Sequence, residues 1–188
     1  MIANKDHYFT PDEYLEWEPQ QEIKYEYVDG EVLAMTGGTI PHNDIALNIA
    51  TALKAYLRGK RCKTSMADAK LGITENGPFH YPDVMVSCDE RDRHATKFIQ
   101  HPCLIVEVLL ESTAAYDRGD KFKKYRRIKT LQEYVLIEQD TVTVDRYKLN
   151  EHGIWELHSY EQGDEIHLDS VDFSFPISLL YEDVEIPE

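Results

Sequence analysis

The sequence predicts an α/β (α+β) fold with a mixed central β-sheet flanked by helices. Continuous apolar runs at 82–88, 103–109 and 133–137 are typical of buried strands. Apolar residues recur at helical spacing over 41–58 and 114–129, so two long helices accompany these strands. The second helix joins two apolar strands and forms a crossover, for which the right-handed connection is the default. This order favours an α/β core over a helical bundle or a sandwich.

The N-terminal part predicts a helix followed by a hairpin. Thr10 is the expected N-cap, Glu13 completes a capping box, and Pro19 stops the helix shortly after residue 17. Asp29–Gly30 is a favoured pair for the tight turn of a hairpin over residues 25–36. We therefore expect a helix-hairpin unit before the central sheet.

The other elements extend the sheet on both sides of the apolar strands. A bent or interrupted strand is expected at 61–74, with a turn at 75–78. After the strand at 133–137, residues 141–149 alternate as its hairpin partner. The segments 154–157 and 171–175 predict short C-terminal antiparallel strands in the same sheet.

Length and charge limit the class of protein. The 188 residues fit a single domain over 1–188. No apolar run approaches the roughly 20 residues of a membrane span, and the first residues lack a signal-peptide pattern, so we expect a cytoplasmic protein. The formal net charge of −15 argues against non-specific coating of nucleic acid, which depends on Lys and Arg neutralising phosphates. Positive charge nevertheless gathers at 54–63 and 118–129, as in a locally basic face.

The cysteines predict no redox or zinc chemistry. Cys62, Cys88 and Cys103 are odd in number and widely spaced, and no CxxC pair is present. We expect all three to be reduced and to pack as small apolar residues.

Two carboxylates on apolar strands carry the main functional signal. Asp83 stands at the start of one strand, and Glu107 lies inside a run that should be buried. A buried, isolated carboxylate is costly unless it is paired, protonated or bound to a metal. Two of them at matching depth suggest a divalent cation site.

A lysine that would complete such a site is absent from the strand. Metal nucleases often carry Glu-x-Lys on one strand face, but the position two beyond Glu107 is Leu109. If the strand ends near Leu110, Glu107 lies about 10 Å from its end at roughly 3.3 Å per residue. Lys121 lies about 10 Å along the returning helix at 1.5 Å per residue. We therefore expect Lys121 to lie level with Glu107.

The residues also resemble a known family. The resemblance is to the Uma-type putative restriction endonucleases of the PD-(D/E)XK nuclease superfamily, over about 10–137, and the matching positions are Glu26 with Asp29–Gly30, His42, Pro82–Asp83, Glu107–Val108–Leu109, Ser112–Thr113, Asp117 through Lys121, Tyr125 and Gln132 through Val135. The family's usual Ser-Pro after Glu-Val-Leu is replaced here by Leu110–Glu111, which changes the loop beside the site.

The resemblance implies a restriction-endonuclease-like fold and Mg²⁺-dependent hydrolysis of DNA, with Mn²⁺ as a substitute. Asp83, Glu107 and the backbone carbonyl of Val108 would bind the metal, and Glu26 would add an acidic group. Lys121 would replace the strand lysine as the third catalytic residue. A carboxylate-bound Mg²⁺ suits this chemistry because it activates water and neutralises phosphate charge. Cleavage of both strands needs two sites, so a homodimer is expected.

Other interpretations of the same residues remain open at this level. Asp83 could be a turn residue, Glu26 a solvent-facing strand residue, and Asp117 and Lys121 a surface ion pair one helical turn apart. His42 follows Pro41 near a helix start, where a cap-like or surface role competes with catalysis. The alternative functions are a catalytically silent nucleic-acid-binding or assembly module, and a hydrolase of another phosphorylated substrate.

Overall fold

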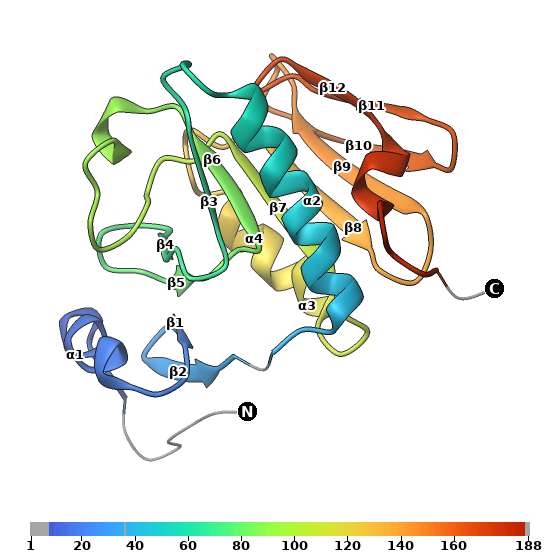
Figure 1. Ribbon diagram of the computed structural model, residues 1–188. Coiled ribbons are helices and arrows are strands. Elements are labelled where there is room, and N and C mark those ends of the chain that lie inside the picture. Colours follow the sequence, from blue (N-terminus) through green and yellow to red (C-terminus); the bar gives the residue numbers. More distant parts are fainter. Residues whose placement is uncertain (1–7, 36, 187–188) are drawn as a thin grey trace.

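A six-stranded mixed sheet forms the centre of the computed structural model, which describes residues 8–35 and 37–186 (Figure 1). Its strand order is β10-β9-β8-β7-β6-β3, and only β7 and β8 pair in parallel. The strands are β3 (Lys63–Met66), β6 (Val84–Ser87), β7 (Leu104–Leu109), β8 (Glu133–Glu138), β9 (Thr143–Leu149) and β10 (Trp155–Glu161). The predicted mixed α+β class and the parallel crossover from β7 to β8 are confirmed.

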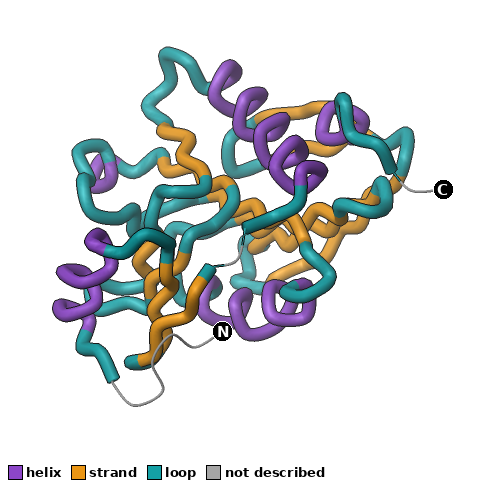
Figure 2. The backbone as a smooth tube through the Cα atoms, turned by 60° about the horizontal axis from the view of Figure 1, so that its bottom comes forward, coloured by secondary structure: helices purple, strands orange, loops and turns teal. Residues whose placement is uncertain are grey.

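A smaller sheet and a short helix form the N-terminal part. The four strands, in the order β2-β1-β5-β4, are β1 (Tyr25–Val28), β2 (Glu31–Ala34), β4 (Leu71–Gly72) and β5 (Phe79–His80). Asp29 and Gly30 both have positive φ, as the tight turn between β1 and β2 requires. The helix α1 (Pro11–Trp17) begins with the predicted capping box and continues into the turn η1 (Glu18–Gln20). Figures 1 and 2 place this part at the opposite end of the molecule from the C-terminus.

Helices cover both faces of the central sheet because the strand residues alternate between two cores. The helix α2 (Ile40–Tyr56) packs over one face, where Val84, Val86 and Val106 point. Met85, Ile105 and Leu109 point to the other face and meet the crossover segment. Side chains of neighbouring strand positions can therefore reach either layer. No helix within residues 8–35 and 37–186 combines the length and apolar character of a membrane span.

The crossover is shorter and less regular than the predicted helix over 114–129. It consists of α3 (Ala114–Tyr116), the π-helical turn η3 (Asp117–Lys121) and α4 (Phe122–Tyr125). Gly119 lies in η3, and glycine lowers helix stability by about 1 kcal/mol relative to alanine. The wider turn changes the angular positions of the residues that follow. Apolar spacing alone did not reveal it.

The last strands do not all join the central sheet. Most of the segment 154–157 lies in β10, which begins at Trp155, but β11 (Glu165–Leu168) and β12 (Phe173–Pro176) form a separate two-stranded sheet. Ile166, Leu168 and Phe175 belong to the same core as the buried face of α2. The turn η4 (Ile177–Tyr181) follows β12 in the chain. These residues bury their apolar face against α2 instead of pairing with β10. The prediction that 171–175 extends the central sheet was therefore wrong, because this strand pairs with β11.

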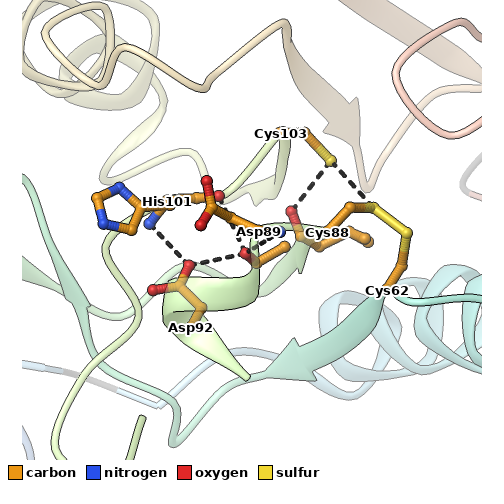
Figure 3. The surroundings of a disulfide bond; sticks show 8 residues. Cys62, Cys88, Asp89, Asp92, His101 and Cys103 are labelled. Atoms are coloured by element: carbon orange, nitrogen blue, oxygen red, sulfur yellow. Dashed lines mark hydrogen bonds between the residues drawn. A yellow bond between two sulfur atoms is a disulfide. The ribbon is translucent and has the colours of Figure 1, made fainter. Parts of the chain in front are cut away.

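The cysteines differ from the prediction. Cys62 and Cys88 form a disulfide, with their Cα atoms 4.0 Å apart (Figure 3). Lys63 is paired with Ser87 across β3 and β6, so Cys62 and Cys88 occupy the next facing positions just beyond the strand ends. Cys103 alone is free and buried, and its Sγ lies 3.8 Å from that of Cys88. A separation of 26 residues hides this cross-strand contact in the sequence. The turn η2 (Glu90–Asp92) follows Cys88 in the chain.

Candidate functional site

Strand pairing brings Asp83 and Glu107 together. Val84 faces Val106 across β6 and β7, which places Asp83 beside Glu107 at the same level of the sheet. The backbone N–H of Asp83 lies 3.3 Å from Glu107 Oε2, to which it donates. The N–H of Val108 donates to Asp83 Oδ2 at 2.7 Å. A backbone N–H of each of the two segments therefore binds the carboxylate of the other segment.

Lys121 lies at the level of this pair. Its Nζ is 2.8 Å from Glu107 Oε1 and 3.2 Å from Asp117 Oδ1, and its side chain is 9% exposed. The turn η3 supplies both Asp117 and Lys121, whose separation of four residues turns them toward each other. Lys121 therefore occupies the position that the strand geometry assigned to it, opposite the glutamate of β7.

The N-terminal sheet adds Glu26 to the same cluster. The pairing of Tyr27 with Phe79 aligns β1 with β5 and sets Glu26 Oε2 3.1 Å from Nδ1 of the fully buried His80. Glu26 Oε1 accepts from the Tyr81 N–H at 3.2 Å and lies 3.9 Å from Lys121 Nζ. Burial acts to raise the pKa of Glu26, but Lys121 and His80 overcome it and lower the pKa to about 2.

The pKa of Glu107 is shifted in the opposite direction to that of Glu26. Burial raises its pKa to about 8 despite the attraction of Lys121, and the charges of Asp83 and Asp117 add to the rise. The Tyr125 hydroxyl donates to Glu107 Oε1 at 2.8 Å, so the carboxyl group is held in place from α4. Burial also raises the pKa of this tyrosine well above its usual value, so it remains a donor. The surroundings therefore do not fully compensate a negative charge on Glu107, and they favour the protonated carboxyl group.

His42 lies on the other side of Asp83. It stands in the first turn of α2, which Thr39 caps by accepting from the His42 N–H at 3.2 Å. The His42 Nε2 lies 3.2 Å from Asp83 Oδ2. Burial acts to lower the pKa of His42, but the contact with Asp83 outweighs it and the pKa is raised. The cap at this helix start is therefore Thr39, and the His42 ring points at the candidate site.

The donor set suits a hard divalent cation completed by water. Asp83 and Glu107 offer adjacent carboxylate oxygens, the ligand type that Mg²⁺ prefers, and Mg²⁺ keeps several waters when few carboxylates bind it. In the described ranges, no three His, Cys, Asp or Glu side chains form a cluster that could hold a metal ion. Side-chain ligands for a cation at this place could come from Asp83 and Glu107.

The sequence analysis did not assign two of the side chains that build the site. His80 precedes the Pro82–Asp83 pair by a few residues, but β5 was not predicted and its partner Glu26 is distant in the chain. Tyr125 is named in the sequence only as a position that matches the family, and its hydroxyl contact with Glu107 is not predicted there. A polar group at the end of an apolar ring is the signal that could have identified it.

Comparisons with known proteins agree with this architecture. A family model described as Uma2, "Putative restriction endonuclease", matches residues 11–178. Protein slr1290 of Synechocystis sp., described as uncharacterized, is 41% identical over 172 residues, covering 92% of this chain and 90% of its own. Protein sll1609 of the same organism, also described as uncharacterized, is 33% identical over 150 residues, covering 79% and 85%.

One solved structure shares the fold. The crystal structure of a putative nuclease belonging to DUF820 from Anabaena variabilis superimposes with a TM-score of 0.77 at 18% identity, covering 94% of this chain and 99% of that one. The resemblance noted in the sequence and the restriction-endonuclease-like fold are thus confirmed.

Proposed function

Because this chain belongs to the Uma2 family of putative restriction endonucleases, we propose that it is a Mg²⁺-dependent DNA endonuclease. Asp83 and Glu107 would hold the cation with the Val108 backbone, and Lys121 would act on the attacking water. The observation that carries the proposal is the 2.8 Å contact between Lys121 Nζ and Glu107 Oε1 beside Asp83. A lysine on the returning crossover thereby compensates for Leu109 on the strand.

Each protein group has a defined part in the proposed hydrolysis. Bound Mg²⁺ supplies charge neutralisation on the phosphate and lowers the pKa of coordinated water. Lys121 holds a compact positive charge next to the carboxylates, where it orients water and stabilises negative charge on oxygen. Burial acts to lower the pKa of this lysine, but Glu107, Glu26 and Asp117 help to raise it well above the usual value, so the lysine stays protonated. Tyr125 acts as a positioning residue by fixing Glu107.

The decisive experiment measures cleavage of plasmid, linear and branched DNA with Mg²⁺ or Mn²⁺ by the intact protein. Glu107→Gln, Asp83→Asn and Lys121→Met should each abolish the activity, and EDTA should do the same. Lys123→Met is the matched control, because Lys123 is two residues away and exposed, and among the described residues its ion pair is with Asp120, at 2.9 Å. Absence of cleavage, or cleavage that survives Glu107→Gln, contradicts the proposal.

A catalytically silent nucleic-acid-binding or assembly module is the second candidate. It is favoured by the closed contacts of Lys121, whose ammonium already meets Glu107 and Asp117 and has little exposure. DNA binding that persists in EDTA and in Glu107→Gln, without turnover, distinguishes it. A parallel screen of free nucleotides tests the third reading, a hydrolase of smaller phosphorylated substrates.

Two properties follow from the proposed reaction. Cutting both strands of a duplex requires two active sites, so we propose that the working form is a homodimer. Sedimentation at assay concentration should show a species of about twice the 21.9 kDa chain mass. Since DNA would be the substrate, we also propose a cytoplasmic location, which fractionation of cells can test.

A further inference from the structure

A groove between α2 and β3 leads away from the candidate site. It encloses about 310 Å³, with Leu47 and Met66 at its apolar surface and Lys54 and Arg58 as its basic groups. Thr51 and Ser65 add hydroxyl groups to the same walls. No carboxylate lines it, although acidic residues outnumber basic ones by 35 to 20 in the whole chain. Figure 1 shows α2 and β3 side by side along this path.

The two basic groups of this groove, Lys54 and Arg58, have no carboxylate beside them in its lining. No Asp or Glu occurs between Asp44 and Asp68, and the intervening segment carries five cations, Lys54, Arg58, Lys60, Arg61 and Lys63. All five are exposed, and none forms an ion pair with any residue of 8–35 and 37–186, while Lys60 lies over the Tyr56 ring. By contrast, exposed Lys123 and half-buried Arg118 are matched by carboxylates. The groove therefore has unused positive charge.

Both walls of the groove begin at the candidate site. His42, in the first turn of α2, contacts Asp83, and at the end of β3 the Ala67 N–H donates to the Asp83 carbonyl at 3.0 Å. Lys54 lies twelve residues after His42, about 18 Å away along the helix at 1.5 Å per residue. At 3.4 Å per step, this length spans about five base pairs of duplex DNA.

The charge and the path favour one class of partner. A nucleic-acid backbone carries regularly spaced negative charge, and Lys, Arg and hydroxyl groups are its usual contacts. An acidic protein surface would match the charge equally well, but nothing would tie it to the Asp83 end. We propose that the α2–β3 groove binds the phosphate backbone of the substrate's flanking arm, about five base pairs from the scissile bond, mainly through Lys54 and Arg58. The identity of this partner depends on the proposed function.

The test is the salt dependence of binding to a labelled 20-base-pair duplex in EDTA, where no metal-dependent turnover occurs. Each lost phosphate contact lowers the slope of log K against log salt by about 0.9. The double variant Lys54→Gln/Arg58→Gln should thus reduce the slope by about 1.8 and weaken binding at low salt at least about tenfold. Arg127→Gln/Lys129→Gln is the matched control, with the same change in charge on exposed residues beyond α4, and should retain the wild-type slope.

The outcomes separate this proposal from the nuclease proposal. An unchanged slope in the groove variant, equal losses in the two double variants, or no duplex binding by the wild-type protein would overturn the groove assignment even if DNA is cleaved. Loss of slope in the groove variant alone supports it even if no cleavage is found. Conversion of a dimer to a monomer by Lys54→Gln/Arg58→Gln, with unchanged duplex binding, would assign the groove to a second copy of the chain and overturn it as well.

Discussion

Two buried charged clusters on the central sheet are built differently. Around Glu133, which is fully buried, the acceptors are matched: Oε1 meets Arg146 Nη1 at 3.2 Å and the Asp169 N–H at 3.2 Å, and Oε2 accepts from the Ser170 N–H at 2.8 Å. Lys148 adds a second cation, 2.8 Å from Asp169. Around Lys121, in contrast, Glu26, Glu107 and Asp117 share one ammonium group.

The difference shows which cluster serves the fold. In the Glu133 cluster, carboxylates and cations balance, and backbone donors complete the glutamate, as a structural ion pair requires. The Lys121 cluster keeps an excess of carboxylates at the mouth of two strands, which destabilises the folded chain by itself. Such an unbalanced arrangement is typical of a functional site.

The largest contrast is expected in cleavage. If the proposed nuclease activity is present, Glu107→Gln should lower the rate at least about 1,000-fold, because metal-held charge is worth several kcal/mol and each 1.36 kcal/mol is tenfold. Glu133→Gln should change the rate of the remaining folded protein by less than about tenfold. Single-turnover cleavage assays on both variants check this, and equal losses would erase the functional distinction between the clusters.

For the free energy of unfolding, the change at Glu133 should have the larger effect and the change at Glu107 the smaller one. Glu133→Ala leaves the buried Arg146 without its fully buried carboxylate partner and should lower the free energy of unfolding by roughly 3–5 kcal/mol. Glu107→Gln in metal-free protein should cost less than about 1 kcal/mol, since the amide resembles the protonated carboxyl that burial favours. Urea denaturation of the two variants measures both values. A larger loss for Glu107→Gln would contradict the comparison.

Addition of Mg²⁺ should stabilise the folded protein through the Lys121 cluster and not through the Glu133 cluster. A ligand present at 100 times its Kd adds about 2.7 kcal/mol to the free energy of unfolding. Thermal melts should therefore shift upward with Mg²⁺ in the wild-type protein and in Asp169→Asn, but not in Asp83→Asn. A shift that persists in Asp83→Asn would move the metal elsewhere.

Per pH unit, the smallest of these effects is the pH dependence of stability in metal-free protein. The folded-state pKa of Glu107 is raised from 4.5 to about 8, so the folded chain binds more protons than the unfolded chain within this window. Its contribution to stability should be present below pH 4.5 and be lost as the pH rises toward 8, by at most about 1.4 kcal/mol per pH unit. Glu26, with its lowered pKa, acts oppositely and loses its contribution as the pH falls from 4.5 toward 2.

Denaturation of the wild-type protein and of Glu107→Gln over pH 5 to 8 isolates the contribution of Glu107 to the free energy of unfolding. The Gln variant should lack the wild-type decline, while Glu133→Gln, if folded, should retain it. A slope that is identical in wild type and Glu107→Gln would show that this carboxyl group titrates normally in the folded state.

The sequence by itself determined what depends on neighbouring residues. The Thr10 capping box, the Asp29–Gly30 turn and the apolar strands follow from local hydrogen bonding and from spacing, and all are present. The level of Lys121 relative to Glu107 also followed, because strand and helix rises are constant over such short distances.

Tertiary structure alone decided the features that join distant segments. The Cys62–Cys88 disulfide depends on the register of β3 with β6, and the contact of Glu26 with His80 depends on the pairing of β1 with β5. The π-helical turn η3 and the separate β11–β12 sheet arise from packing against the sheet and against α2. Such contacts have no local pattern, because their free energy comes from surfaces that meet only when the chain is folded.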